Sequence, residues 1–319
     1  MSRLSHGVRK WLGKEKMAHQ PSDPLKRADA LEHRLNQFAE GLAHAHHRLN
    51  ILDGVITSND QNLTSAKNID QGMRTEDPHM MTLQERGIPK PPLNLSAEKA
   101  DHADITDDGF WSIVPKVHDF TELPVSILYN LYSAIRYIIS AGIQGDIVEC
   151  GVHMGGSVMA AEHVLLKFDT HSDRRIFALD TFTGFVTRHK TLDVDLQTGA
   201  IACDPNDSFD FGEGSIANMR SVGFSGLNVI RGDVLKTIPT LNVKSIALLR
   251  LDTDTYETTK FELEQLYDRV VPGGVVIIDD YGYTRGCKKA VDDFIYDKPI
   301  LLQRINRNVR SWVKCSPSL

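Results

Sequence analysis

The chain has 319 residues, of which 41% are hydrophobic and 24% are charged. This composition suits one domain with a hydrophobic core of ordinary size plus an extension. The formal net charge of -6 provides no dominant basic surface, so a nucleic-acid partner is not expected. A small molecule or a glycan is the expected class of substrate.

Cysteine spacing and hydropathy indicate the cellular environment. The four cysteines are far apart and form no CxxC pair, so neither a zinc knuckle nor a disulfide framework is expected. No stretch approaches the roughly 18 to 20 apolar residues of a membrane span. The N-terminus also lacks the apolar core of a signal peptide. These features predict a soluble, cytoplasmic protein.

Residues 1–21 are predicted to form a basic tail. If residues 1–20 are helical, one face carries the apolar side chains and most of the basic residues lie off it. Such a face suits weak peripheral contact with an anionic membrane. A frayed tail that docks weakly on the protein itself is the favoured alternative, because the segment is short. The apolar residues of this face are Leu4, Val8, Trp11 and Leu12.

Residues 22–54 are predicted to form one long helix, because Ser22-Asp23-Pro24 is typical of a helix start. Its apolar positions alternate by three and four for more than three heptads, which favours a coiled coil and a homo-oligomer. A helix packed on its own domain fits the pattern equally well, since Gly41 weakens the seam. The seam positions are Ala28, Leu31, Leu35, Phe38, Leu42, Ala45, Leu49 and Leu52.

Residues 55–110 are polar, and Pro89, Pro91 and Pro92 interrupt any helical pattern. They are therefore predicted to form a linker or a lid. Helical periodicity returns over residues 124–140. The main domain is expected to span residues 111–319.

Within this domain, short apolar strands alternate with helical stretches, which indicates a parallel sheet covered on both faces. Asn306-Arg307-Asn308 predicts a tight turn between the last two strands, which then form an antiparallel hairpin at one edge. The predicted fold is α/β, a Rossmann-like, doubly wound sheet of seven strands. The expected strands are residues 146–150, 175–179, 227–231, 246–252, 275–278, 300–305 and 309–315.

The first candidate site follows the strand that ends at Cys150. Glu149 lies at the end of this strand, Gly151 and Gly155 lie in the turn, and Ser157 lies at the start of a helix. Glycines let a ligand approach the backbone closely, and a helix N-terminus favours a carboxylate or phosphate. The spacing differs from the GxGxxG of dinucleotide-binding folds, which disfavours a nicotinamide-dependent oxidoreductase. A tight turn without a ligand is the alternative.

Two further acids follow the next two strands. Asp180 ends its strand at the position where nucleotide-binding sheets place an acid that bonds to ribose hydroxyls. Asp233 follows the next strand, from which it would reach the adenine end of the same ligand. A helix-capping role for Asp180 and a turn role for Asp233 are the competing interpretations.

The most informative feature is a set of four carboxylates at two strand ends. Asp252 and Asp254 close one strand, and Asp279 and Asp280 close the next. Four carboxylates at one edge repel one another and resist ionising together unless a divalent cation compensates them. Hard oxygen ligands in this number favour Mg²⁺, or alternatively Mn²⁺ or Ca²⁺. A helix cap or a solvated loop is the alternative for either pair taken alone.

These motifs, in this order, resemble the macrocin O-methyltransferase family over roughly residues 120–315. Four ordered motifs are far more specific than one. The family includes sugar O-methyltransferases that modify macrolide and aminocoumarin antibiotics. The matching segments are Glu149-Cys150-Gly151 with Gly155-Gly156-Ser157, residues 180–185, residues 249–257, and Pro272-Gly273-Gly274 with residues 278–282.

The resemblance implies a class I methyltransferase fold, S-adenosylmethionine as methyl donor, a magnesium ion and a sugar-containing acceptor. By position, Asp252, Asp279 and Asp280 correspond to the family's metal ligands, and Asp254 corresponds to its general base. Methylation of a catechol-like phenol and a non-catalytic coiled-coil scaffold are the alternatives. The residues expected to bind the cofactor are Glu149, Gly151, Gly155, Ser157, Asp180 and Asp233.

Overall fold

The computed structural model describes residues 80–171, 173–186, 188–205 and 212–315. These residues belong to a compact unit that begins at Arg74. The predicted basic tail, the predicted heptad helix and residues 55–79 of the predicted linker lie outside the described residues. Membrane contact and self-association through residues 1–54 therefore remain predictions.

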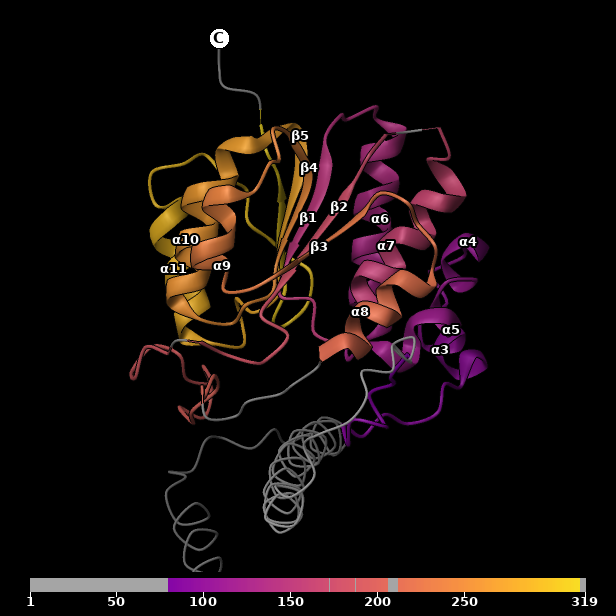
Figure 1. Cartoon of the computed structure of the whole chain (residues 1–319), viewed down its shortest axis with the longest axis horizontal. Coiled ribbons are helices and arrows are strands. Elements are labelled where there is room, and N and C mark those ends of the chain that lie inside the picture. Colours follow the sequence, from indigo (N-terminus) through magenta and orange to yellow (C-terminus); the bar gives the residue numbers. More distant parts are fainter. Residues whose placement is uncertain (1–79, 172, 187, 206–211, 316–319) are drawn as a thin grey trace, which may run out of the picture. The chain divides into compact units, whose positions relative to one another are not determined.

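A seven-stranded sheet in the order β3-β2-β1-β4-β5-β7-β6 forms the centre of this unit (Figure 1). Strands β1 to β5 are mutually parallel, and β7 pairs antiparallel with β5 and with β6. The predicted doubly wound α/β sheet with an antiparallel edge hairpin is confirmed. The strands are β1 Asp146–Cys150, β2 Ile176–Asp180, β3 Leu227–Arg231, β4 Ile246–Leu251, β5 Val270–Ile278, β6 Gln303–Arg304 and β7 Arg310–Val313.

The turn between β6 and β7 is closed by one side chain. Oδ1 of Asn306 accepts hydrogen bonds from the backbone N–H groups of Asn308, at 2.8 Å, and Val309, at 2.7 Å. Asparagine favours such turns because its short side chain can replace a backbone acceptor. The tight turn predicted from Asn306-Arg307-Asn308 is therefore present.

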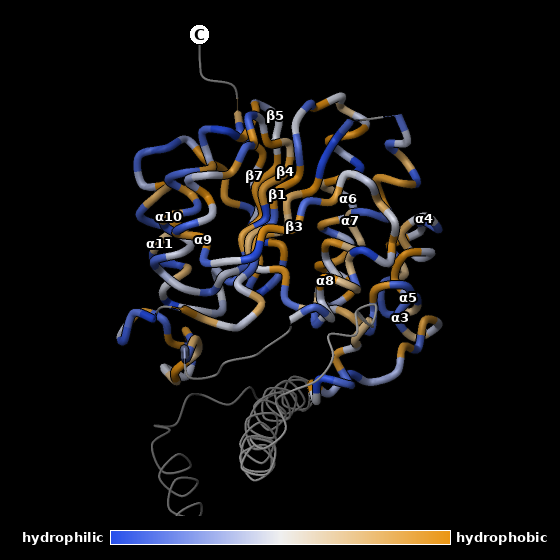
Figure 2. The backbone as a smooth tube through the Cα atoms, in the orientation of Figure 1, coloured by the Kyte–Doolittle hydropathy of each residue, from blue (hydrophilic) through white to orange (hydrophobic). Residues whose placement is uncertain are grey.

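Helices cover both faces of the sheet, with α6, α7 and α8 on one face and α9, α10 and α11 on the other (Figure 1). Side chains alternate between the faces, so that Ile147 joins one core cluster and Val148 the other. The strands therefore form the most continuously hydrophobic part of the chain (Figure 2). The helices are α3 Leu95–Asp101, α4 Asp108–Trp111, α5 Val114–Val117, η1 His118–Phe120, α6 Val125–Ser140, α7 Gly156–Phe168, α8 Gly212–Ser221, α9 Val234–Thr237, η2 Ile238–Thr240, α10 Tyr256–Leu266, η3 Tyr267–Arg269 and α11 Arg285–Ile295.

Strand β5 begins at Val270, five residues before its predicted start. Pro272, Gly273 and Gly274 interrupt the apolar pattern and predict a turn. The strand accommodates them through a register shift between Ile246 and Leu248 of β4. The predicted start was therefore wrong because turn-forming residues lie within a bulged strand.

Residues 80–110, assigned to a linker or lid from the sequence, are in large part packed on the domain. Leu83 is fully buried and packs with Met154 of the loop after β1. Phe110 lies in the main core cluster, and the side chain of Asn218 bonds to both the N–H and the C=O of Met81. Helices α3 and α4, which begin here, have only seven and four residues, too few to show helical periodicity in the sequence.

Among the described residues, no helix combines the length and apolar character needed to cross a bilayer. Cys150, Cys203 and Cys287 are buried, Cys315 is exposed, and all four are free.

Candidate active site

The loop between β1 and α7 is shaped by Asp180, which ends the neighbouring strand β2. Oδ2 of Asp180 accepts hydrogen bonds from the N–H groups of Val152, at 2.7 Å, and His153, at 3.0 Å. Its Oδ1 accepts the N–H of Phe182 at 2.8 Å. Bonds from N–H groups to a carboxylate are stronger than neutral ones. Asp180 therefore fixes the loop, and whether it also bonds to a ribose remains a prediction.

Two glycines of this loop are required by the geometry. Gly151 has φ +81° and Gly155 has φ +86°, in the left-handed region that favours glycine. A Cβ on Gly155 would lie 2.5 Å from Cγ of Met219, and a Cβ on Gly151 would lie only 1.9 Å from the backbone O of Asp252. The glycine loop after β1 is therefore in direct contact with the acidic loop after β4.

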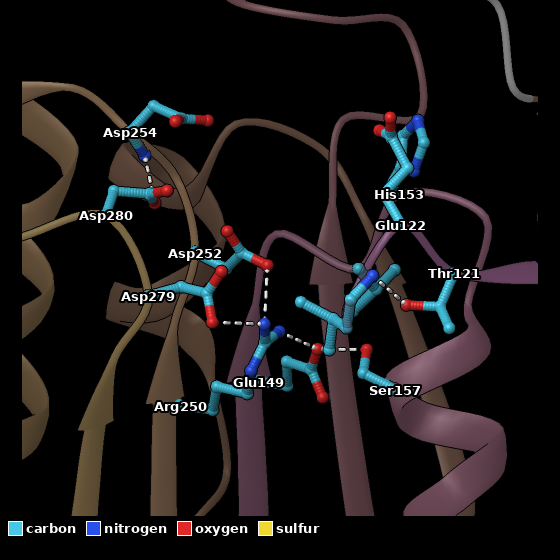
Figure 3. A network of polar contacts seen from close by, with 12 residues as sticks. Thr121, Glu122, Glu149, His153, Ser157, Arg250, Asp252, Asp254, Asp279 and Asp280 are labelled. Carbon is cyan, nitrogen blue, oxygen red and sulfur yellow. Dashed lines mark hydrogen bonds and ion pairs between the residues drawn. The ribbon is translucent and has the colours of Figure 1, made fainter. Parts of the chain in front are cut away.

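Glu149 and Ser157 connect the end of β1 to the first turn of α7. Glu149 is 2% exposed, and its Oε1 accepts a hydrogen bond from the Ser157 hydroxyl. Nη1 of Arg250 donates to the same oxygen at 2.6 Å (Figure 3). Burial raises the pKa of Glu149, and the guanidinium of Arg250 opposes this shift. Both predicted cofactor residues thus lie at the base of the loop.

Asp233 lies at the end of β3, where the sequence predicts contact with the adenine of the cofactor. Its Oδ1 accepts the N–H of Leu235 at 3.0 Å, so it is the N-cap of α9. It also forms an ion pair with Lys236 at 3.4 Å. This capping role agrees with the alternative prediction, that Asp233 is a turn residue. The contact of Asp233 with the cofactor remains a prediction.

The predicted acids after β4 and β5 converge in part. Oxygen atoms of Asp252, Asp254 and Asp280 all lie within 4.8 Å of one another, and these three residues are called the acidic cluster below. Oδ2 of Asp280 accepts the backbone N–H of Asp254 at 3.2 Å (Figure 3). Asp254 has φ 61°, a left-handed conformation that aspartate tolerates better than most residues. The cluster lies at the carboxyl ends of two adjacent parallel strands, where such sheets bind ligands.

Burial and mutual repulsion make ionisation of the acidic cluster unfavourable. Burial raises the pKa of Asp252 and of Asp280, and neighbouring carboxylates raise both further. Burial likewise raises the pKa of Asp254, to about 7. A divalent cation would reverse these shifts by favouring the ionised forms. The donor set, three carboxylates with hard oxygen atoms, fits Mg²⁺.

Asp279, which the sequence groups with the metal ligands, has a different partner. Its Oδ1 accepts a hydrogen bond from Nη2 of Arg250 at 2.7 Å, and the same nitrogen lies 2.8 Å from Oδ2 of Asp252. Sequence reasoning assigned no role to Arg250. The available signal was a charged residue within the otherwise apolar strand β4.

Two further buried acids support the acidic loop and were also missed. Asp193 is fully buried, and its Oδ1 accepts the N–H of Tyr256 at 2.7 Å, at the start of α10. Glu262 of α10 is fully buried and accepts the Thr253 hydroxyl at 3.0 Å. Neither acid lies in a recognisable motif, because each is brought to the loop by tertiary packing.

The parallel sheet, its antiparallel β5-β7 pair and the glycine loop after β1 are those of a class I methyltransferase. Residues 98–312 match the family model described as macrocin-O-methyltransferase (TylF). The match covers well over half of the chain, which therefore belongs to the macrocin O-methyltransferase family. The predicted resemblance is confirmed, and so is the expectation of an S-adenosylmethionine-dependent O-methyltransferase.

Curated relatives match the chain at moderate identity. Demethyldecarbamoylnovobiocin O-methyltransferase of Streptomyces niveus is 29% identical over 184 residues, which are 54% of this chain and 67% of the relative. Mycinamicin III 3''-O-methyltransferase of Micromonospora griseorubida is 29% identical over 182 residues, 54% of this chain and 69% of the relative. A Streptomyces olivaceus relative, 8-demethyl-8-(2,3-dimethoxy-alpha-L-rhamnosyl)-tetracenomycin-C 4'-O-methyltransferase, is 32% identical over 180 residues, 52% of this chain and 64% of the relative.

A solved structure supports the same assignment. The structure of the O-methyltransferase NovP superposes with a TM-score of 0.52 and 25% sequence identity. The superposition covers 64% of this chain and 88% of that chain.

Proposed function

We propose that this enzyme transfers the methyl group of S-adenosylmethionine to a hydroxyl of a sugar-containing acceptor, with a divalent cation held by Asp252, Asp279 and Asp280. The contact between the glycine loop and the acidic loop carries this proposal. Because Gly151 abuts the carbonyl of Asp252, a donor bound at the first loop and an acceptor bound at the second share one edge of the sheet.

The acceptor class is inferred from the relatives. Their names specify methylation of novobiocin, mycinamicin and tetracenomycin compounds, and the last name includes a rhamnosyl group. The net charge of -6 also favours an acceptor that is not a polyanion. A hydroxyl of a sugar is therefore the proposed methylation site.

The proposed cation ligands include Asp252 and Asp280, which belong both to the set expected from the sequence and to the acidic cluster. The third residue differs: it is Asp279 in the set expected from the sequence and Asp254 in the acidic cluster. A divalent cation supplies Lewis acidity, which lowers the pKa of a hydroxyl beside it. We assign the third ligand to Asp279, since its carboxylate is held beside that of Asp252 through Arg250.

Asp254 is proposed as the general base. Its backbone is held at both ends, because its N–H donates to Asp280 and its C=O accepts the Thr284 hydroxyl at 2.5 Å. Its carboxylate takes the proton of the acceptor hydroxyl while the oxygen attacks the sulfonium methyl in line. A C–O bond forms, the S–C bond breaks, and S-adenosylhomocysteine leaves. No covalent enzyme intermediate is required.

Calorimetric titration with S-adenosylmethionine and then Mg²⁺ tests this proposal on the wild type, Asp280→Asn and a control. Asp297→Asn is the control because Asp297 is exposed and lies in the turn after α11. We expect the wild type and the control to bind both, and Asp280→Asn to bind the cofactor while losing at least about tenfold in Mg²⁺ affinity. Folded protein that binds no cofactor would overturn the assignment, and unchanged Mg²⁺ binding by Asp280→Asn would overturn the metal site.

The acceptor is tested separately by mass spectrometry of methylated products. Glycosides with adjacent free hydroxyls are compared with a simple catechol under the same conditions. Methylation of glycosides is expected. Methylation of the catechol alone would replace the sugar acceptor with a phenol.

A further inference from the structure

Arg250 is a fully buried cation near the carboxyl end of the central strand β4. It lies in β4 and is paired in register with Glu149 of β1 and Ile277 of β5. Its exposed fraction is 1%. Arginine is almost never buried to this extent unless it is paired with acids, because removing a charge from water is costly.

The guanidinium of Arg250 bridges three acids from three strand ends. Nη1 donates to Glu149 at 2.6 Å, and Nη2 contacts Asp279 at 2.7 Å and Asp252 at 2.8 Å (Figure 3). Burial alone would lower the pKa of Arg250, but the carboxylates of Asp279, Asp252 and Glu149 more than reverse this shift. Arginine is always charged in proteins, and these carboxylates favour its charged form further.

The charges at this edge of the sheet do not balance. Besides Arg250 and its three partner acids, this edge carries two more acids of the acidic cluster, Asp254 and Asp280. Within the described part of the chain, the ion pairs of these five acids all involve Arg250. When these acids are ionised, one guanidinium leaves several negative charges uncompensated, so the ionised site favours a second cation. That cation would share Asp252 and Asp279 with Arg250.

We propose that Arg250 is a built-in counter-cation, which keeps the acidic site assembled without metal and, by holding Asp252 and Asp279, lowers the affinity for the divalent cation. This inference rests on the proposed metal site. Two positive charges that share the same carboxylates repel each other, and this repulsion is strong in a buried site. Metal binding is then weakened but is not needed for folding.

Three arginine variants test this inference through thermal unfolding with chelator or with Mg²⁺, and through Mg²⁺ affinity by calorimetry. Arg250→Met removes the charge while keeping much of the apolar volume. Arg250→Lys keeps the charge but lacks the planar fork that bridges several acids. Arg174→Met is the matched control, because Arg174 is 9% exposed and pairs with Asp169 outside the acidic site.

In Arg250→Met, we expect a Tm well below that of the wild type in chelator, a large recovery with Mg²⁺, and Mg²⁺ binding about tenfold tighter. The wild-type Tm should change little between the two conditions. Arg250→Lys should have a Tm in chelator and a Mg²⁺ affinity between those of the wild type and Arg250→Met. It preserves the test if Arg250→Met does not fold in either condition. Arg174→Met should lose stability equally with chelator and with Mg²⁺.

Mg²⁺ affinity that is unchanged or weaker in both Arg250 variants, without a metal-dependent gain in Tm, would overturn the inference. The proposed metal site has a separate outcome. If the wild type binds no Mg²⁺ but Arg250→Met does, the guanidinium replaces the divalent cation in the wild type. This result supports the inference and removes the metal from the proposed function. If neither binds Mg²⁺, both are overturned.

Discussion

Asp180, which holds the glycine loop, and the acids of the acidic cluster have the same chemistry but opposite surroundings. Asp180 accepts three backbone N–H groups, whereas the carboxylates of Asp252, Asp254 and Asp280 crowd against one another. A carboxylate with enough donors organises the backbone, and a carboxylate that faces other carboxylates selects cations. The surrounding donors therefore decide what each strand-end acid does.

Within the acidic cluster, the largest expected effect is the loss of methyl-transfer rate in Asp254→Asn. Without a base, the acceptor hydroxyl keeps its proton as it attacks, so kcat should fall by about 10²- to 10⁴-fold. The Kd values for S-adenosylmethionine and Mg²⁺ should stay within about threefold of the wild type, since the amide retains the size of the side chain. Steady-state kinetics and calorimetry measure both quantities.

Asp279→Asn is the matched comparison for this prediction. As a proposed ligand, it should weaken Mg²⁺ binding, and saturating Mg²⁺ should restore part of kcat. If Asp254→Asn instead loses Mg²⁺ binding while Asp279→Asn keeps it, Asp254 is the third ligand and the base must lie elsewhere.

Gly151→Ala tests whether the two regions depend on their mutual contact. Its Cβ would lie 1.9 Å from the backbone O of Asp252 at φ +81°, so the two loops must separate. We expect the free energy of unfolding to fall by about 3 kcal/mol, with weaker binding of both cofactor and Mg²⁺. Denaturant titration and calorimetry measure these changes.

Gly142→Ala separates the clash from the cost of a left-handed backbone. Gly142 has φ +66° and no heavy atom within 4 Å of the added Cβ. Its loss of stability should be about 1 kcal/mol, without an effect on either ligand. Equal losses in the two variants would show that the contact between the loops contributes nothing.

Asp180→Asn should affect the glycine loop alone. The amide offers one acceptor oxygen and places an NH₂ group opposite a backbone N–H, so the bonds to Val152 and His153 or the bond to Phe182 are lost. We expect about tenfold weaker binding of S-adenosylmethionine and unchanged binding of Mg²⁺. Weakened Mg²⁺ binding would mean that the loop and the cluster are not separable.

Asp233→Asn is the companion variant at the end of β3. Asparagine caps helices as well as aspartate does, so α9 should keep its stability. Any loss of cofactor affinity then reports the predicted adenine contact directly.

Much of the fold could be predicted because strand ends are marked in the sequence. The five parallel strands are apolar runs, and the acids and glycines that follow them mark the ligand-binding edge. The start of β5 was hidden by Pro272-Gly273-Gly274, and the short helices before α6 lack periodicity. These errors occur where local propensity and tertiary structure disagree.

The candidate site was less predictable, for a geometric reason. Asp279 and Asp280 are adjacent in the sequence, yet Asp279 contacts Arg250 while Asp280 joins the acidic cluster. The two residues lie in the bend that follows β5, where their side chains diverge (Figure 3), and sequence motifs do not convey this. The partners Arg250 and Asp193 come from other strands and loops, so only the tertiary structure brings them together.

A pH-dependent effect on stability distinguishes two buried glutamates, one in α7 after the glycine loop and one in α10 after the acidic loop. Glu162 of α7 is fully buried, and among the described residues no group bonds to either of its oxygens. Burial raises its pKa to about 9. Burial also raises the pKa of Glu262 of α10, to about 8, and the Thr253 hydroxyl partly opposes this shift. The two side chains therefore differ mainly in one hydrogen bond.

Because the folded-state pKa of Glu162 lies above the ordinary value of 4.5, the folded protein retains a proton that the unfolded chain loses. Stability therefore falls as pH rises from about 4.5 to about 9. Glu162→Gln is neutral in both states, so its stability advantage over the wild type should grow from pH 5 to pH 8, by up to about 1.4 kcal/mol per pH unit. Glu262→Gln should gain less, since its carboxylate is partly satisfied. Urea unfolding at the two pH values measures these differences, and parallel pH profiles of Glu162→Gln and the wild type would show that Glu162 is ionised in the folded protein.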